Sequence, residues 1–187
     1  MGKLIFAAAF LLLTGCSATA PVPNQYKVPD TPGSHPYNFD CDTEAGKYSE
    51  RNAAISGTNI WITGYMQVVT LRPSPEWPPD AGVVFAGPNK LPRVGLETFV
   101  LPDKPGILQI AVRGTGGSAD HTVFTSMPLS DARIRFTLQV NELGQLSLSV
   151  GNATRTLPIG SVQITRANVY CSSAHIQFSN VLAGSDW

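Results

Sequence analysis

Apolar and polar residues alternate along much of the chain with a period of two, the period of a β-strand that turns one face to a core. The segment 59–71, NIWITGYMQVVTL, has an aliphatic face and a polar or aromatic face. The aliphatic face holds Ile60, Ile62, Met66 and Val68. The other face holds Trp61, Thr63, Tyr65 and Gln67. This pattern predicts a strand with one buried side.

The segment 132–150, ARIRFTLQVNELGQLSLSV, repeats the alternation on both sides of a turn through Asn141 to Gly144, which predicts a β-hairpin. An early strand is expected at FDC, residues 39–41, running into a loop at AGKYSE. Further strands are expected at 82–85, 95–101, 107–113, 121–126 and 167–181, the last as one continuous strand. Pro- and Gly-rich segments separate them, and an amphipathic helix of convincing length is lacking. The sequence therefore predicts an all-β protein, an antiparallel β-sandwich of the jelly-roll kind.

The first residues have the pattern of an export signal. Lys3 supplies a positive start, and the apolar run from Leu4 to Leu13 is too short to span a membrane, which takes about 20 residues. We therefore expect residues 1–15 to be a signal peptide that is removed.

Leu13, Thr14, Gly15 and Cys16 resemble the lipobox of bacterial lipoproteins. That resemblance implies that Cys16 becomes the new N-terminus, with a diacylglycerol on its sulfur and a further acyl chain such as palmitate on its amine, which together anchor the protein to a membrane. Ser17 in place of an aspartate resembles the signal for the outer membrane of a Gram-negative bacterium. We expect the protein in the cell envelope; an ordinary signal peptide with a chance cysteine is the alternative.

Residues 16–37 contain many prolines and few aliphatic residues, which is typical of an extended spacer. We expect a tether over 16–37 and a single β-sandwich domain over 38–187. The thirteen basic and thirteen acidic residues balance and form no basic run, so nucleic acid is not expected as a partner.

Lipidation of Cys16 leaves two cysteines, Cys41 and Cys171. In an exported protein the natural interpretation is a disulfide between them. Two buried thiols that never meet remain the alternative. A metal site is not expected, since no CxxC or histidine cluster accompanies either cysteine.

The order of these features resembles the concanavalin A-like lectin and glucanase superfamily. The resemblance rests on the FDC strand, the GTNIWITGYMQVV strand, AGVVF, the RFTLQVNELGQLSLSV hairpin and the final NVYCSSAHIQFSNV segment. It implies a bent sandwich whose concave face or rim loops hold glycans.

Catalytic motifs of that superfamily are missing. Its glucanases project a carboxylate pair from one strand as ExDxxE, as retaining glycosidases require, and that string is absent. The nearest acidic residues are Asp40, Asp42 and Glu44 in FDCDTE, and Glu97 in GLETF. A GxSxG elbow is also absent. We therefore expect a protein that is not an enzyme and that needs no cofactor; a rim calcium through Asp103 or Asp120 has little support.

A polar face opposite the aliphatic one is the candidate ligand-binding surface. Its predicted members are Trp61, Tyr65, Gln67 and Arg135, with Trp77 on the RPSPEWPPD loop as a second aromatic. Gln109 and Arg113, together with Arg133, Gln139, His175 and Gln177, are expected on the same side. Aromatic rings suit sugar C–H groups, and planar polar groups suit hydroxyls. The sequence thus predicts an envelope lipoprotein with a non-catalytic lectin-like domain that binds glycan or another envelope component; a structural lipoprotein that binds proteins, or a glycan hydrolase, is the alternative.

Overall fold

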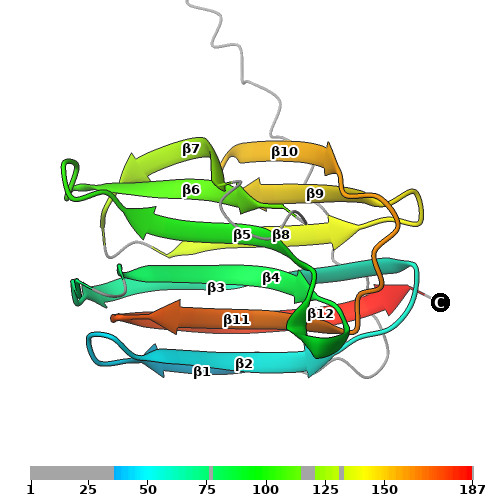
Figure 1. The fold of residues 1–187 in the computed structure, drawn as a ribbon, viewed down its shortest axis with the longest axis horizontal. Helices are drawn as coiled ribbons and strands as arrows, with labels where there is room; N and C mark the ends of the chain where they lie inside the picture. The colour runs from blue at the N-terminus through cyan, green and yellow to red at the C-terminus, as the bar shows by residue number, and fades with distance from the viewer. Residues whose placement is uncertain (1–35, 76–77, 115–120, 131–132, 187) are drawn as a thin grey trace, which may run out of the picture. The chain divides into compact units, whose positions relative to one another are not determined.

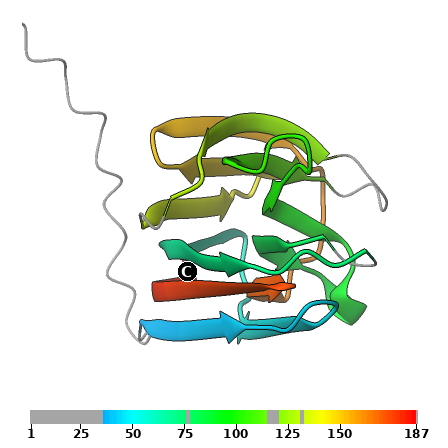
Figure 2. The ribbon, with the colours of Figure 1, turned by 90° about the vertical axis from the view of Figure 1, so that its left-hand side faces the viewer.

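Two six-stranded antiparallel sheets pack face to face in the computed structural model, which describes residues 36–75, 78–114, 121–130 and 133–186 (Figures 1 and 2). The first sheet has the order β1 (Tyr37–Asp42), β12 (Ala174–Asp186), β3 (Asn59–Leu71), β8 (Ile134–Val140), β9 (Gln145–Val150), β10 (Ala153–Pro158). The second has the order β2 (Tyr48–Ala54), β11 (Arg166–Ser172), β4 (Asp80–Ala86), β5 (Arg93–Val100), β6 (Ile107–Arg113), β7 (His121–Pro128). A short 3-10 turn, η1 (Pro88–Lys90), joins β4 to β5. The predicted antiparallel jelly-roll sandwich is confirmed.

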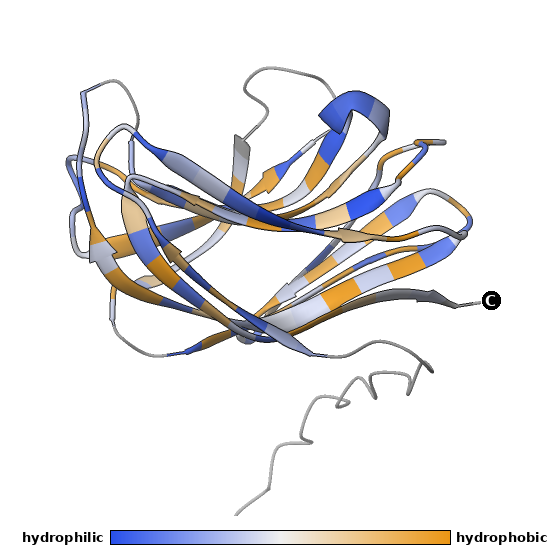
Figure 3. Ribbon diagram, turned by 90° about the horizontal axis from the view of Figure 1, so that it is seen from below, coloured by the Kyte–Doolittle hydropathy of each residue, from blue (hydrophilic) through white to orange (hydrophobic). Residues whose placement is uncertain are grey.

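The core lies between the inward faces of the two sheets, and hydrophobic and hydrophilic residues alternate along most of the strands (Figure 3). On the first sheet the inward face includes Ile62, Met66, Phe136, Leu138, Leu148 and Phe178, each 1% exposed or less. On the second sheet it includes Val83, Phe85, Leu96, Ile110 and Val169, each fully buried. Alternation in the sequence therefore fixes which side chains enter the core.

The strand at 59–71, the strand at 107–113 and the 132–150 hairpin are where the sequence predicts them. Two strands at the ends of the sheets, β2 and β10, were not predicted, because YSERNAA and ATRTLP are too polar to show a buried face. The single strand expected over 167–181 is wrong. Ser173 has a φ of 50°, and the chain leaves β11 of the second sheet there and enters β12 of the first.

Cys41 and Cys171 form a disulfide, as predicted, with their Cα atoms 6.0 Å apart. Cys41 lies on β1 of the first sheet and Cys171 on β11 of the second. Both residues are fully buried, so the bridge ties the two sheets together from inside the core.

The predicted signal peptide, Cys16 and nearly all of the tether lie outside the described residues, and so does Trp77. The lipid anchor and the division of the chain at residues 15 and 37 therefore stay predictions. All strands belong to one compact unit, Thr31–Trp187. Within the described part of the chain, no helix has the length and apolar character needed to cross a membrane.

Candidate functional site

The predicted ligand face is the outer face of the first sheet. Trp61, Tyr65 and Gln67 project from β3 on this side, and Tyr65 lies directly opposite Arg135 of β8. Trp61 is only 5% exposed. Its ring covers Gly184, where an added Cβ would lie 2.9 Å from the Trp61 ring. The four residues are neighbours as predicted, but the indole is largely covered, and their role in binding stays a prediction.

Gln109 and Arg113 are not part of that face. Both lie on β6 of the second sheet, on its outer side, so the two residues belong to the opposite surface of the sandwich. A period of two shows that a residue faces outward but not from which sheet it does so. The expectation of one shared polar face is therefore corrected to two separate faces.

The outer face of the second sheet carries polar side chains that are buried. The buried polar residues are Glu97, Gln109, Asn168 and Ser172, and the aromatic Tyr170 between the last two is 2% exposed. Their inward-facing neighbours Leu96, Ile110 and Val169 fill the core. Burial of polar groups costs free energy unless they are hydrogen-bonded, and proteins tolerate that cost where the groups serve a function. This face is therefore the strongest candidate site.

Tyr170 lies across strand β4 to reach β5. It is opposite Gly82 in the register, and Gly82 in turn is opposite Glu97. The Tyr170 hydroxyl donates a hydrogen bond to Glu97 Oε1 over 3.1 Å, and Arg113 approaches the same oxygen to 3.5 Å. A Cβ on Gly82 would lie 2.4 Å from the Tyr170 ring, so only glycine leaves room for this contact.

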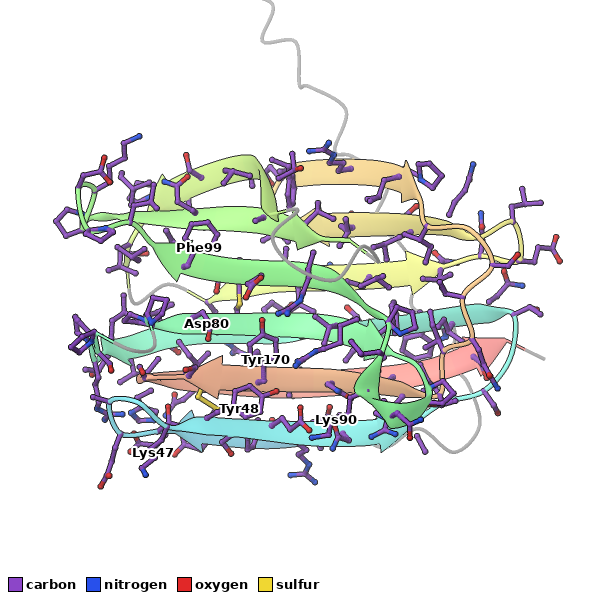
Figure 4. All side chains as sticks on the ribbon, in the orientation of Figure 1. Lys47, Tyr48, Asp80, Lys90, Phe99 and Tyr170 are labelled. Carbon is purple, nitrogen blue, oxygen red and sulfur yellow. A yellow bond between two sulfur atoms is a disulfide. The ribbon has the colours of Figure 1, made fainter. Side chains whose placement is uncertain are left out.

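A second, more exposed group surrounds Tyr48 at the β2 edge. Tyr48 donates a hydrogen bond of 2.6 Å to Glu50 and accepts one of 3.2 Å from Arg93. Lys90 donates to the other Glu50 oxygen over 2.9 Å. The Tyr48 ring is 46% exposed and packs on Tyr170 with 5.5 Å between the ring centroids (Figure 4). We call Tyr48, Glu50, Lys90 and Arg93 the rim group.

Burial and charge alter the acidity of the rim group. Burial, with the hydrogen bond to Glu50, raises the pKa of Tyr48 to about 12. Burial also acts to raise the pKa of Glu50, but hydrogen bonds from Tyr48 and Lys90 outweigh it and hold that pKa below its usual value. At neutral pH Glu50 is thus a carboxylate that accepts a hydrogen bond from the Tyr48 phenol, which keeps its proton.

Asp80 lies at the start of β4, near Tyr170 and Glu97 (Figure 4). Burial, together with the charge of Glu97, raises the pKa of Asp80 to about 8. Burial raises the pKa of Tyr170 well above its ordinary value, with the charges of Glu97 and Asp80 adding to the effect. At neutral pH Asp80 and Tyr170 therefore both keep their protons and can act as hydrogen-bond donors.

The acidic residues singled out in FDCDTE lie elsewhere. Asp40 and Asp42 share the outer face of the first sheet, where Asp40 pairs with His175 at 2.6 Å and Asp42 with Arg72. Glu44 is exposed in the turn after β1. Among the described residues no group of three or more His, Cys, Asp or Glu side chains is placed to hold a metal ion, and Asp120 lies outside them.

Sequence reasoning missed most of this site. The sequence predicts a loop where Tyr48 and Glu50 lie on β2, and no local pattern distinguishes Asp80 and Tyr170. Glu97 was noted as an acid but not placed. The available signal was Glu97 itself, a charged residue inside the otherwise apolar strand RVGLETFV, next to a neighbouring strand that carries Gly82.

No protein-family model matches the sequence, and no curated protein matches it. Solved structures do match. An alginate lyase from Pseudomonas aeruginosa is 16% identical with a TM-score of 0.50, over 69% of this chain and 65% of that one, which is less than two thirds of that enzyme. A variant of alginate lyase Aly36B, in complex with an alginate trisaccharide, is 10% identical with a TM-score of 0.54, over 77% of this chain and 80% of that one. The CBM2 module of the evolved Dit of Lactobacillus casei BL23 phage J-1 is 10% identical with a TM-score of 0.54, over 77% of this chain and 74% of that one.

These likenesses correct one expectation. The prediction that the protein is not an enzyme is contradicted at the level of the fold, because many structural neighbours are alginate lyases. That prediction rested on the missing carboxylate pair and serine elbow of hydrolases, and lyases are a different class of enzyme. At 16% identity or less the likeness shows the fold alone, which is the concanavalin-like jelly-roll sandwich that the sequence predicts.

Proposed function

We propose that this protein is a lipid-anchored envelope protein that cleaves an acidic polysaccharide by elimination at the outer face of the second sheet. The observation that carries the proposal is the Tyr48 phenol, held between the Glu50 carboxylate at 2.6 Å and the Arg93 guanidinium at 3.2 Å. Alginate lyases with the same fold supply the reaction class. The exposed Tyr48 ring gives a sugar access to this group.

The rim group has the parts that elimination from a uronate needs. Lys90 and Arg93 are cations that bind the sugar carboxylate and stabilise the charge that develops when the C5 proton leaves. Tyr48 accepts that proton while its own proton passes to Glu50. The C5–H electrons form the C4–C5 double bond and the C4–O bond breaks. The departing oxygen takes a proton from water, and the hydroxide that remains takes the proton from Glu50, which restores the carboxylate.

Tyr48→Phe is expected to lower the rate of cleavage by about 100-fold or more, because it removes the hydroxyl but keeps the ring. The measurement is the ultraviolet absorbance of the new conjugated double bond in polyuronate digests, with a neutral glucan as the comparison polymer. Tyr65→Phe on the first sheet is the matched control and is expected to keep the wild-type rate. Polyuronate binding without any rise in absorbance would show a binding protein instead.

The lipid anchor has its own test. Cys16→Ser is expected to shift the protein from the membrane fraction to the soluble fraction, because it removes the sulfur that takes the diacylglycerol. Immunoblots of fractionated cells measure this, with Ser17→Ala as the control that keeps the cysteine. Membrane association as firm as that of the wild type would mean that the anchor is not at Cys16.

A further inference from the structure

Asp80 and Glu97 stand next to one another on the outer face of the second sheet. Gly82 of β4 is opposite Glu97 of β5, so Asp80, two residues before Gly82, is the diagonal neighbour of Glu97 on the same side. The two carboxyl groups interact, since the charge of Glu97 is one of the causes that raise the pKa of Asp80. Two ionised carboxylates side by side in a buried site repel each other, so the pair favours keeping one proton.

Burial makes this proton hard to lose. Glu97 is 5% exposed, and Asp80 Oδ1 is buried without a hydrogen-bond partner among the described residues. If Asp80 and Glu97 were both ionised, two negative charges would lie next to each other out of water, which is unfavourable. The groups that face Asp80 are Glu97 and Arg93 of β5, Arg113 of β6, and Tyr170 and Ser172 of β11, with Tyr48 and Glu50 of β2 beyond them.

We propose that Asp80 is a positioning residue that shares one proton with Glu97, and that this proton lets the face accept an anionic sugar. The inference rests on the function proposed above. With the proton in place, three cations, Lys90, Arg93 and Arg113, face two carboxylates, Glu50 and Glu97, which leaves one net positive charge. Without it the face is neutral, and the added negative charge competes with the ligand for Arg93 and Arg113.

The expected pH range follows from the raised pKa of Asp80, about 8, which burial causes first and the Glu97 charge second. Below that pH the shared proton stays and an anionic sugar binds. Above it the pair ionises and binding weakens. Glu97, which contacts Tyr170 and Arg113, then has a charged Asp80 beside it in place of a neutral one.

The binding experiment uses a polyuronate oligosaccharide and the whole folded protein, titrated on both sides of pH 8. The wild-type affinity is expected to fall roughly tenfold across the transition. Asp80→Asn, which keeps the shape and a donor to Glu97 but cannot ionise, is expected to hold its affinity throughout. Asp42→Asn on the first sheet is the control and should follow the wild type. Wild-type affinity that does not change with pH, or the same fall in Asp80→Asn, overturns the proposal.

A ligand-free measurement separates the shared proton from the proposed function. In the folded protein the pKa of Asp80 is about 8, above its ordinary value of 3.8. The contribution of its proton to stability is therefore fully present below pH 3.8 and is lost as the pH rises through 8. Asp80→Asn should remove this loss, so its Tm advantage over the wild type should grow from acid to pH 8. A constant Tm difference overturns the shared proton. A Tm difference that grows with pH, in a protein that does not bind polyuronate, would uphold the shared proton. It would overturn the role of that proton toward an anionic sugar, together with the proposed function.

Discussion

Loss of the Cys41–Cys171 disulfide is expected to lower the free energy of unfolding by about 4 to 5 kcal/mol. The two cysteines are 130 residues apart in the sequence, so the bridge removes much of the chain entropy of the unfolded state. It also joins β1 of the first sheet to β11 of the second. Because β11 carries Tyr170, the same loss is expected to loosen the candidate site.

Urea unfolding of the Cys41→Ala, Cys171→Ala double variant measures this effect. Wild-type protein under reducing conditions is the matched control, because it keeps both side chains and lacks only the bond. The two samples are expected to lose similar stability. A large loss in the double variant with no loss on reduction would assign the effect to the cavities that the alanines leave, not to the bond.

Local patterns predict the central strands of this fold well. Strand β3 and the β8–β9 hairpin show alternation because one face of each is buried in the core and the other is polar. The disulfide was predictable because the expected lipidation of Cys16 leaves Cys41 and Cys171 as the one remaining pair. Strands β2 and β10 were not predictable, since they lie at the ends of their sheets and have weak alternation.

The candidate site depends on pairing between distant segments, which local sequence does not encode. Tyr48, Asp80, Glu97 and Tyr170 come from four strands that meet only through the order β2-β11-β4-β5. Tyr170 looks like an ordinary alternating residue until its partner in β4 is known to be Gly82. The outer face of the first sheet was easier to predict because Trp61, Tyr65 and Gln67 are on one strand, yet the burial of Trp61 depends on Gly184 of β12.

Gly82→Ala is the substitution at the site with the largest expected effect on stability. The new methyl group would lie 2.4 Å from the Tyr170 ring and 2.7 Å from the carbonyl oxygen of Leu96, and the backbone oxygen cannot easily yield. We expect a loss of stability of about 3 kcal/mol. Displacement of the Tyr170 ring also breaks its 3.1 Å hydrogen bond to Glu97, so the proposed cleavage should fall as well.

Gly106→Ala is the matched control, because an added Cβ there meets nothing within 4 Å. It is expected to change stability by no more than about 0.5 kcal/mol. A double-mutant cycle between Gly82→Ala and Tyr170→Ala isolates the ring clash: the cost of the added methyl group should drop when the ring is absent, and only the contact with Leu96 should remain. Equal costs in the two backgrounds would show that Tyr170 does not lie across Gly82 in solution, and the arrangement of the site around Glu97 would then be wrong.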